Sequence, residues 1–185
     1  MLKMTWSKKA CESARKWAKK CPSRNSPKEE RTVDGGICGE NILQSSYSTS
    51  WLAVIEVWQR KESNFKYGIG TIDPRKNIYS YSQLVWYKAH QIGCALAYCP
   101  GKSYPFLYIC RYCPRGIGID HLAMPYKEGP PCEDCPYDCE DKLCTNPCRY
   151  EDRKMDCKAV ISLFSCKSSF EQQCEATCKC TTEIN

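Results

Sequence analysis

The chain has 185 residues, of which 17 are cysteines, and its formal net charge is +6. This length provides one domain of ordinary size and a second small one. The sequence excludes a membrane-spanning helix, since no apolar run reaches about 18 residues, and its many cysteines indicate an oxidising, extracellular setting in which nucleic acid is not an expected partner.

Charge and cysteines are both distributed unevenly along the chain. Residues 1–131 carry 20 lysines and arginines against 10 acidic residues, a net +10, whereas residues 132–185 carry 7 against 11, a net −4. A basic body of this kind is able to bind a polyanion such as heparan, although an ordinary solvated surface explains the charge better. Residues 132–185 also hold ten cysteines, a density typical of small domains stabilised by disulfides.

The first regular elements are predicted to be helices. Residues 5–21 form an amphipathic helix whose apolar residues recur at helical spacing: Trp6, Ala10, Ala14, Trp17 and Cys21. Residues 22–36 are polar, with glycine and proline, and predict a loop. A second helix follows from residues 38–42. A third begins near residues 48–50, any of which can cap it, and runs through Trp58 with one apolar face.

Strands are predicted to follow the helices. Residues 79–87, 92–99 and 105–113 are rich in aromatic and branched side chains, and the turn residues 100–103 connect the last two segments as a hairpin. Helices followed by an antiparallel sheet predict an α+β layered domain. Beyond an extended arm, residues 156–180 are predicted to be short helical turns pinned by cysteines.

The cysteines by themselves leave two interpretations open. Cys110 and Cys113, followed after 18 residues by Cys132 and Cys135, have the spacing of a four-cysteine zinc site. A chain so dense in cysteine produces such spacings by chance. The favoured rival is a framework of eight disulfides with one thiol left over.

Residue types that commonly carry catalysis are scarce. The two histidines, His90 and His121, are expected at the surface, and no motif pairs a cysteine with a histidine. Glu40 is expected near the start of a helix, where orphan amides favour a carboxylate. None of these residues predicts a catalytic site.

Several motifs together resemble the cysteine-rich secretory proteins of vertebrates. They are MLKMTW at 1–6, CGENI at 38–42, YSQLVWY at 81–87, CRYCP at 110–114 and CTNPC at 144–148. The tail CKCTTEIN at 178–185 is most similar to the mammalian epididymal members. The resemblance covers the whole chain.

The resemblance implies an α-β-α sandwich over residues 1–128 and a disulfide hinge over residues 129–147. A small helical cysteine-rich domain, similar to potassium-channel-blocking toxins, is implied over residues 148–185. Family members normally carry a signal peptide and a long first helix before the position of Met1. Some apolar surface of the sandwich is therefore expected to be exposed.

A disulfide for every cysteine but one is also implied by the resemblance. The implied pairs are Cys21–Cys99, Cys38–Cys113, Cys94–Cys110, Cys132–Cys139, Cys135–Cys144, Cys148–Cys180, Cys157–Cys174 and Cys166–Cys178. Cys11 replaces a small residue of the family and is expected to be the free thiol. At about 100° per residue it lies at the edge of the buried helix stripe, partly reachable and able to pair between chains.

The family's metal-binding cleft resembles a set of two histidines and two glutamates, which suits zinc. The corresponding residues here are Asn25, Glu40, Lys61 and Ser80, so one ligand of the set remains. We therefore expect neither a metal nor another cofactor. An exposed ion pair between Glu40 and Lys61 is a further expectation.

The function that the resemblance implies is that of a secreted binding protein without enzymatic activity. Its expected partner is an ion channel or another cell-surface protein of sperm or egg, with roles in sperm maturation and sperm–egg interaction. The candidate channel contacts are Lys158, Phe164, Lys167 and Phe170, although the two phenylalanines are better explained as core residues. The alternative is sterol or lipid carriage by the first domain.

Overall fold

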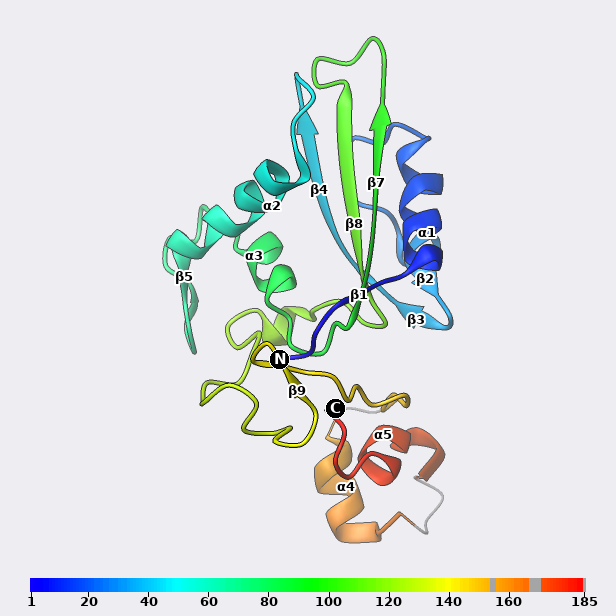
Figure 1. Ribbon diagram of the computed structural model, residues 1–185, viewed down its shortest axis with the longest axis vertical. Coiled ribbons are helices and arrows are strands. Elements are labelled where there is room, and N and C mark those ends of the chain that lie inside the picture. Colours follow the sequence, from blue (N-terminus) through cyan, green and yellow to red (C-terminus); the bar gives the residue numbers. More distant parts are fainter. Residues whose placement is uncertain (154–155, 167–170, 185) are drawn as a thin grey trace. The chain divides into compact units, whose positions relative to one another are not determined.

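The computed structural model describes residues 1–153, 156–166 and 171–184 (Figure 1). The chain divides into two compact units, one formed by Met4–Lys127 and the other by Met1–Lys3 together with Glu128–Asn185. Each unit has its own kind of interior, so the two are described separately. Among the described residues, no helix has the length and apolar composition needed to cross a bilayer.

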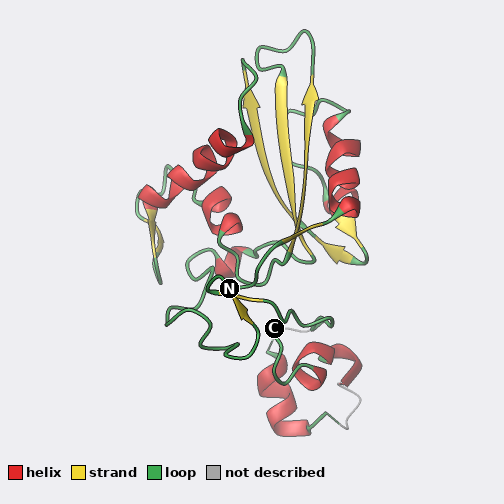
Figure 2. Cartoon of the chain, in the orientation of Figure 1, coloured by secondary structure: helices red, strands yellow, loops and turns green. Residues whose placement is uncertain are grey.

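The larger unit is built on a four-stranded sheet with the strand order β1-β7-β8-β4. Figure 2 shows its strands between helices. The strands are β1 (Thr5–Trp6), β4 (Gly39–Ser45), β7 (Gln91–Tyr98) and β8 (Phe106–Cys113). β8 pairs antiparallel with both β4 and β7, whereas β1 is parallel to β7. The central strand β8 is almost entirely buried, as expected for a strand with a neighbour on each side.

Helix α1 (Lys8–Ala18) covers one face of this sheet through small side chains. Ala14 and Ala18 pack against Ala95, Leu107 and Ile109. A Cβ atom added to the glycine between Ile92 and Cys94 would lie 2.1 Å from the backbone nitrogen of Cys11, so α1 approaches β7 as closely as a bare backbone permits.

The opposite face of the sheet carries the larger aromatic core. Helices α2 (Trp51–Gln59) and α3 (Tyr79–Leu84) supply residues to it. Its buried members are Val54, Trp58, Trp86, Ala89, Tyr108, Cys110, Tyr112 and Ile117. Helices on both faces of one sheet make an α-β-α sandwich, and the predicted α+β fold is confirmed.

The two longer helices of the sandwich start at serine caps. The hydroxyl of Ser7 accepts a hydrogen bond from the amide of Ala10, and that of Ser50 accepts one from Ala53. Such a bond satisfies an amide that has no partner in the first helical turn. The predicted cap of the third helix was therefore right, whereas the predicted helix from residue 5 begins later because Thr5–Trp6 is a strand.

Two predicted elements have the wrong secondary structure. The helix expected from residues 38–42 is strand β4, whose pairing with β8 runs from Gly39–Tyr112 to Ser45–Phe106. The strand expected at residues 79–87 contains helix α3 instead. Short apolar runs do not distinguish helix from strand, and here the neighbouring chain decides.

Shorter elements connect the main ones. Residues 22–36, predicted to be a loop, contain the 3₁₀ helix η1 and strand β2. The short elements of this unit are η1 (Lys28–Arg31), β2 (Thr32–Val33), β3 (Gly36–Ile37), η2 (Arg60–Asn64), β5 (Phe65–Lys66), β6 (Gly70–Thr71) and η3 (Ile119–His121).

The smaller unit has little apolar interior and many covalent links. Its elements are β9 (Cys139–Glu140), β10 (Leu143–Cys144), α4 (Cys157–Phe164), η4 (Glu171–Gln173) and α5 (Glu175–Lys179). Its disulfides are Cys132–Cys139, Cys135–Cys144, Cys148–Cys180, Cys157–Cys174 and Cys166–Cys178. The short helical turns expected in residues 156–180 are present.

The first residues of the chain belong to this smaller unit. Leu2 is buried against Cys135 and Cys144, and the amide of Lys3 donates to the carbonyl of Cys144 at 2.8 Å. The compact unit that contains the sandwich runs from Met4 to Lys127, while the expected domain of residues 1–128 stays a prediction. The further division expected between residues 147 and 148 stays a prediction.

Mild reduction should unfold the smaller unit before the sandwich. The smaller unit has few buried apolar residues and depends on its disulfides, of which Cys132–Cys139 has one exposed cysteine, Cys139, whereas the sandwich has an apolar core of its own. Loss of one native disulfide costs a small domain about 2–5 kcal/mol. Hydrogen exchange measured by mass spectrometry after mild reduction should show protection lost first beyond residue 132. Loss that begins in residues 79–113 would contradict this order.

Candidate functional site

Disulfides account for every cysteine of the alternative zinc site. Cys110 is bonded to Cys94 and Cys113 to Cys38, while Cys132 and Cys135 are bonded within the smaller unit. Together with Cys21–Cys99, the eight pairs are the same as those that the family resemblance implies. No sulfur of the proposed four-cysteine set is left to bind zinc.

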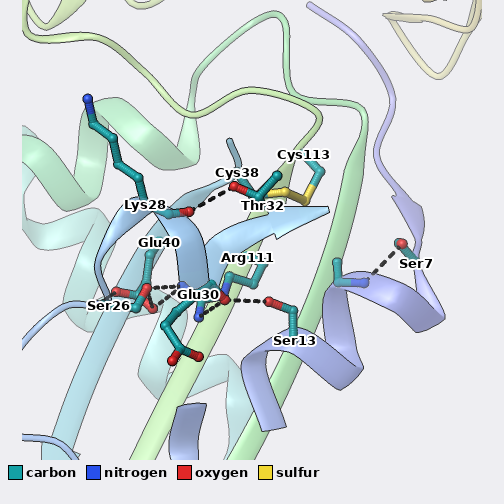
Figure 3. The surroundings of a disulfide bond; sticks show 11 residues. Ser7, Ser13, Ser26, Lys28, Glu30, Thr32, Cys38, Glu40, Arg111 and Cys113 are labelled. Carbon is teal, nitrogen blue, oxygen red and sulfur yellow. Dashed lines mark hydrogen bonds and ion pairs between the residues drawn. A yellow bond between two sulfur atoms is a disulfide. The ribbon is translucent and has the colours of Figure 1, made fainter. Parts of the chain in front are cut away.

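Glu40, the one ligand of the expected metal set that this chain keeps, is 1% exposed. It sits on β4 rather than at a helix start, so the capping role expected for it is wrong. One carboxylate oxygen accepts from the amide of Ser26 at 2.8 Å, and the other accepts from the Ser26 hydroxyl at 3.0 Å. The carboxylate thus holds the segment before η1 against the sheet (Figure 3).

The partner of Glu40 is Arg111, which is fully buried. The two residues stand opposite one another in the register of β4 and β8, and Arg111 Nη1 donates both to Glu40 and to the Ser26 hydroxyl. Burial lowers the pKa of Arg111, while the adjacent carboxylate opposes that effect. A guanidinium stays protonated in proteins, so the cleft contains an internal cation supplied by the chain.

Arg31 brings a second guanidinium to the same segment. Its Nη1 donates to the carbonyl of Ser26, and its positive charge contributes to the lowered pKa of Arg111. Figure 3 shows Ser26 beside Glu40, with Arg111, Glu30 and Ser13 close by. Ser26 is therefore the common hydrogen-bonding partner in a small polar network that connects β4, β8 and η1.

The other residues of the expected cleft do not join this network. Asn25 and Lys61 are exposed, and the backbone carbonyl of Ser80 accepts a hydrogen bond from the side chain of Asn41 at 2.9 Å. The expected ion pair between Glu40 and Lys61 is wrong, because Glu40 is buried against Arg111. Sequence reasoning overlooked Arg111, although a single charge inside an apolar strand was a signal for it.

These residues do not fit a divalent cation. The one remaining carboxylate is already bonded to a serine and a guanidinium, and the positive guanidinium repels a metal ion. In residues 1–153, 156–166 and 171–184, no group of three histidine, cysteine or acidic side chains is arranged to hold a metal.

The histidines lie in different surroundings. His121 is exposed and its ring lies 5.2 Å from that of Trp86. His90 is half-buried rather than a surface residue, and burial lowers its pKa.

Cys11 is the unpaired cysteine among the described residues, as expected, but it is less accessible than expected. The side chain is 9% exposed, and its thiol donates to the carbonyl of Cys94 at 3.1 Å. Trp6 is not part of α1, so the centre of the buried stripe lies closer to Cys11 than the sequence pattern indicated. A buried thiol is poorly placed to pair between chains.

The candidate channel contacts are only partly described. Lys158 and Phe164 lie on α4, and both are exposed. Phe164 is 56% exposed, so its interpretation as a core residue is wrong. Lys167 and Phe170 lie outside the described residues.

Comparison with known proteins identifies both parts of the chain. A family model described as "Cysteine-rich secretory protein family" matches residues 1–112, and another described as "Crisp" matches residues 132–185. The chain is thus similar to that family over the sandwich and over the disulfide-rich part.

Solved structures show the same fold. BmVAL-1 is 29% identical over 78% of this chain and 73% of its own, with a TM-score of 0.55. The Schistosoma mansoni venom allergen-like protein 4 is 21% identical over 70% of this chain and 77% of its own, with a TM-score of 0.58. Hookworm platelet inhibitor is 22% identical over 81% of this chain and 79% of its own, with a TM-score of 0.57. At the lower identities the likeness concerns the fold alone.

Removing either member of the buried ion pair should destabilise the sandwich strongly. Glu40→Gln or Arg111→Met should each lower the free energy of unfolding by about 3–5 kcal/mol, because the remaining group stays buried without its partner. Urea denaturation measures this. The double variant should lose less than the sum of the single variants.

The exposed pair of Lys20 and Glu30 provides the matched control. Lys20→Met should cost at most about 1 kcal/mol, since water screens that pair. If both buried variants lose as little free energy of unfolding as the control variant, the ion pair does not hold β4 to β8.

Zinc should find no tight site in this cleft. Calorimetric titration of the tag-free protein should give only weak heats, unchanged by Glu40→Gln, because Arg111 already neutralises the carboxylate. A single tight site that Glu40→Gln abolishes would contradict the assignment.

Proposed function

The chain belongs to the cysteine-rich secretory protein family, and we propose that it acts outside the cell as a binding protein rather than as an enzyme. The number of disulfides supports an oxidising location. Glu40 argues against a catalytic role, because it forms a buried ion pair with Arg111 and is not available as an acid or base.

We further propose that the smaller unit modulates an ion channel. The observation that carries this proposal is an exposed apolar pair at the end of α4, where Leu163 is 78% and Phe164 56% exposed. Disulfides hold the surrounding backbone, so little conformational entropy is lost on binding. An aromatic anchor on a rigid support is the kind of residue that dominates binding energy.

Lys158 adds a positive charge to the same helix. The partner in this proposal is a channel or another cell-surface protein of sperm or egg. The roles in sperm maturation and sperm–egg interaction come from the family resemblance.

Carriage of a sterol or lipid by the sandwich is the second candidate. Trp51, Leu52 and Ile55 are exposed on α2, which otherwise packs on the aromatic core. Exposed apolar side chains on one helix provide a surface for an apolar ligand. A third partner, a sulfated polyanion, is supported by the basic residues of α1.

Patch-clamp recording with the full-length protein tests the channel proposal. Applied to cells that express voltage-gated potassium channels, the protein should reduce the current, and Phe164→Ala should weaken the effect by about 10-fold or more, as expected for an anchor residue. Tyr137→Ala is the matched control, since Tyr137 is an almost fully exposed aromatic residue of the same unit. Equal potency of the Phe164 variant and the parent would refute the assigned contact.

A sterol-binding assay on the same proteins separates the two candidates. Leu52→Glu should abolish sterol binding if the sandwich is a carrier and should leave the channel effect unchanged. Absence of any current change together with sterol binding sensitive to Leu52→Glu would favour the carrier function.

A further inference from the structure

The outer edge of strand β7 is open over half of its length. On its inner side, β7 pairs with β8 from Gln91–Cys113 to Tyr98–Phe106. On its outer side, among the residues that the structure describes, only Gln91 and Ile92 pair with a strand, which is β1. The remaining residues of β7 therefore form an edge strand.

Hydrogen bonds at the covered end show which backbone groups face outward. The amide of Thr5 donates to the carbonyl of His90 at 2.9 Å, and that of Ser7 donates to Ile92 at 2.8 Å. Backbone groups alternate in direction along a strand, so Leu96 and Tyr98 also face the outer edge. Among the described residues, neither has a backbone hydrogen bond on that side.

The side chains of this edge are apolar and exposed. Leu96 is 45% and Tyr98 64% exposed, and the Tyr98 ring lies 5.3 Å from the ring of Phe106. Both project from the face of the sheet opposite α1, because the intervening alanines pack against that helix. The strand QIGCALAY contains neither a charge nor a proline, the usual means of preventing an edge from pairing.

A stripe of basic residues, formed by Lys8 and Arg15 of α1 and by its C-terminal cap Lys19, runs beside the same edge. At 100° per residue these side chains lie within about 20° of their common direction. Arg15 reaches the sulfur of Cys11 at 3.7 Å, and that sulfur contacts the β7 carbonyl of Cys94. All three basic residues of the stripe are exposed.

Two lysines that point elsewhere, Lys9 on α1 and Lys20 just beyond it, are neutralised by ion pairs. Lys9 pairs with Asp34 at 2.6 Å and Lys20 pairs with Glu30 at 2.5 Å. Together with Lys16, Lys9 lines a groove between α1 and residues 29–34 rather than the edge of β7. Lys16 has no ion pair among the described residues but faces that groove, so the positive charge beside the edge of β7 is that of the stripe.

We propose that the open edge of β7 binds an extended segment of a partner protein in which apolar and acidic residues alternate. Its backbone pairs with Leu96 and Tyr98, as in other cases of strand addition. Because side chains alternate between the faces of a strand, apolar residues of the segment meet Leu96 and Tyr98 while acidic residues face the basic stripe.

A second copy of the chain is a poorer occupant of this edge. Antiparallel pairing of β7 with itself has a two-fold axis perpendicular to the sheet, which places both copies of α1 on the same side. The two basic stripes would then oppose each other, and like charges across an interface are unfavourable.

The test uses the full-length protein and an end-blocked peptide of alternating valine and glutamate, with a peptide of alternating valine and lysine as its counterpart. Fluorescence anisotropy should detect binding of the acidic peptide only. Amide hydrogen exchange should be fast at Leu96 and Tyr98 in the free protein and slow once the acidic peptide is bound.

Charge variants on one helix provide the matched comparison. Arg15→Glu with Lys19→Glu should weaken peptide binding at least 10-fold, whereas Lys16→Glu, on another side of α1, should change it less than 2-fold. Leu96→Lys should weaken binding as strongly as the double variant does. These surface positions are exposed, so the variants are expected to fold.

Three outcomes would overturn the proposal. One is binding without slower exchange at Leu96 and Tyr98, and another is equal binding of both peptides. The third is concentration-dependent dimerisation, seen by light scattering, that itself protects these amides. The smaller unit takes no part in the test, so failure here is independent of the channel proposal.

Discussion

Among the ion pairs described, that between Glu40 and Arg111 is the one with both side chains buried, and the polar interior of the sandwich depends on it. Two opposite charges that are 1% and 0% exposed lose nearly all contact with water, at a cost of several kcal/mol for each ion. Their attraction offsets this cost only if hydrogen bonds use the remaining polar atoms. Ser26 supplies such bonds to both residues, so the segment before η1 cannot leave the sheet without exposing two charges. The pair thereby ties β4 to β8 in the register in which the two residues stand opposite one another.

The same pair changes the chemistry of the cleft. A carboxylate that faces an empty polar cleft attracts a cation, whereas here Arg111 provides the positive charge from within the chain. The compensation is incomplete, since Arg111 Nε has no hydrogen-bond partner among the described residues. A site with one carboxylate and an internal guanidinium serves to stabilise the fold, and the binding surfaces proposed above lie elsewhere.

Sequence reasoning succeeded where local signals and tertiary context agree. Serine caps and helical spacing located α2, and the aromatic runs at residues 92–99 and 105–113 correspond to β7 and β8. It failed at residues 38–45 and 79–84, because strand pairing and packing override weak local preferences. The disulfide pairs came from the resemblance, since spacing permits many connectivities. Arg111 could have been noticed in the sequence as a lone charge in an apolar strand. Its partner could not be predicted, because it depends on the register between β4 and β8.

Different forces hold the two units, and this bears on where binding surfaces arise. The sandwich derives its stability from a buried core, so it tolerates exposed apolar side chains on α2 and β7 that the core does not require. The smaller unit has few buried apolar residues, and covalent links fix its backbone instead. Apolar side chains can therefore stay exposed in this unit, as Leu163 and Phe164 do. Exposed apolar residues therefore have separate physical origins in the two units, and each surface can acquire its own partner without destabilising the other unit.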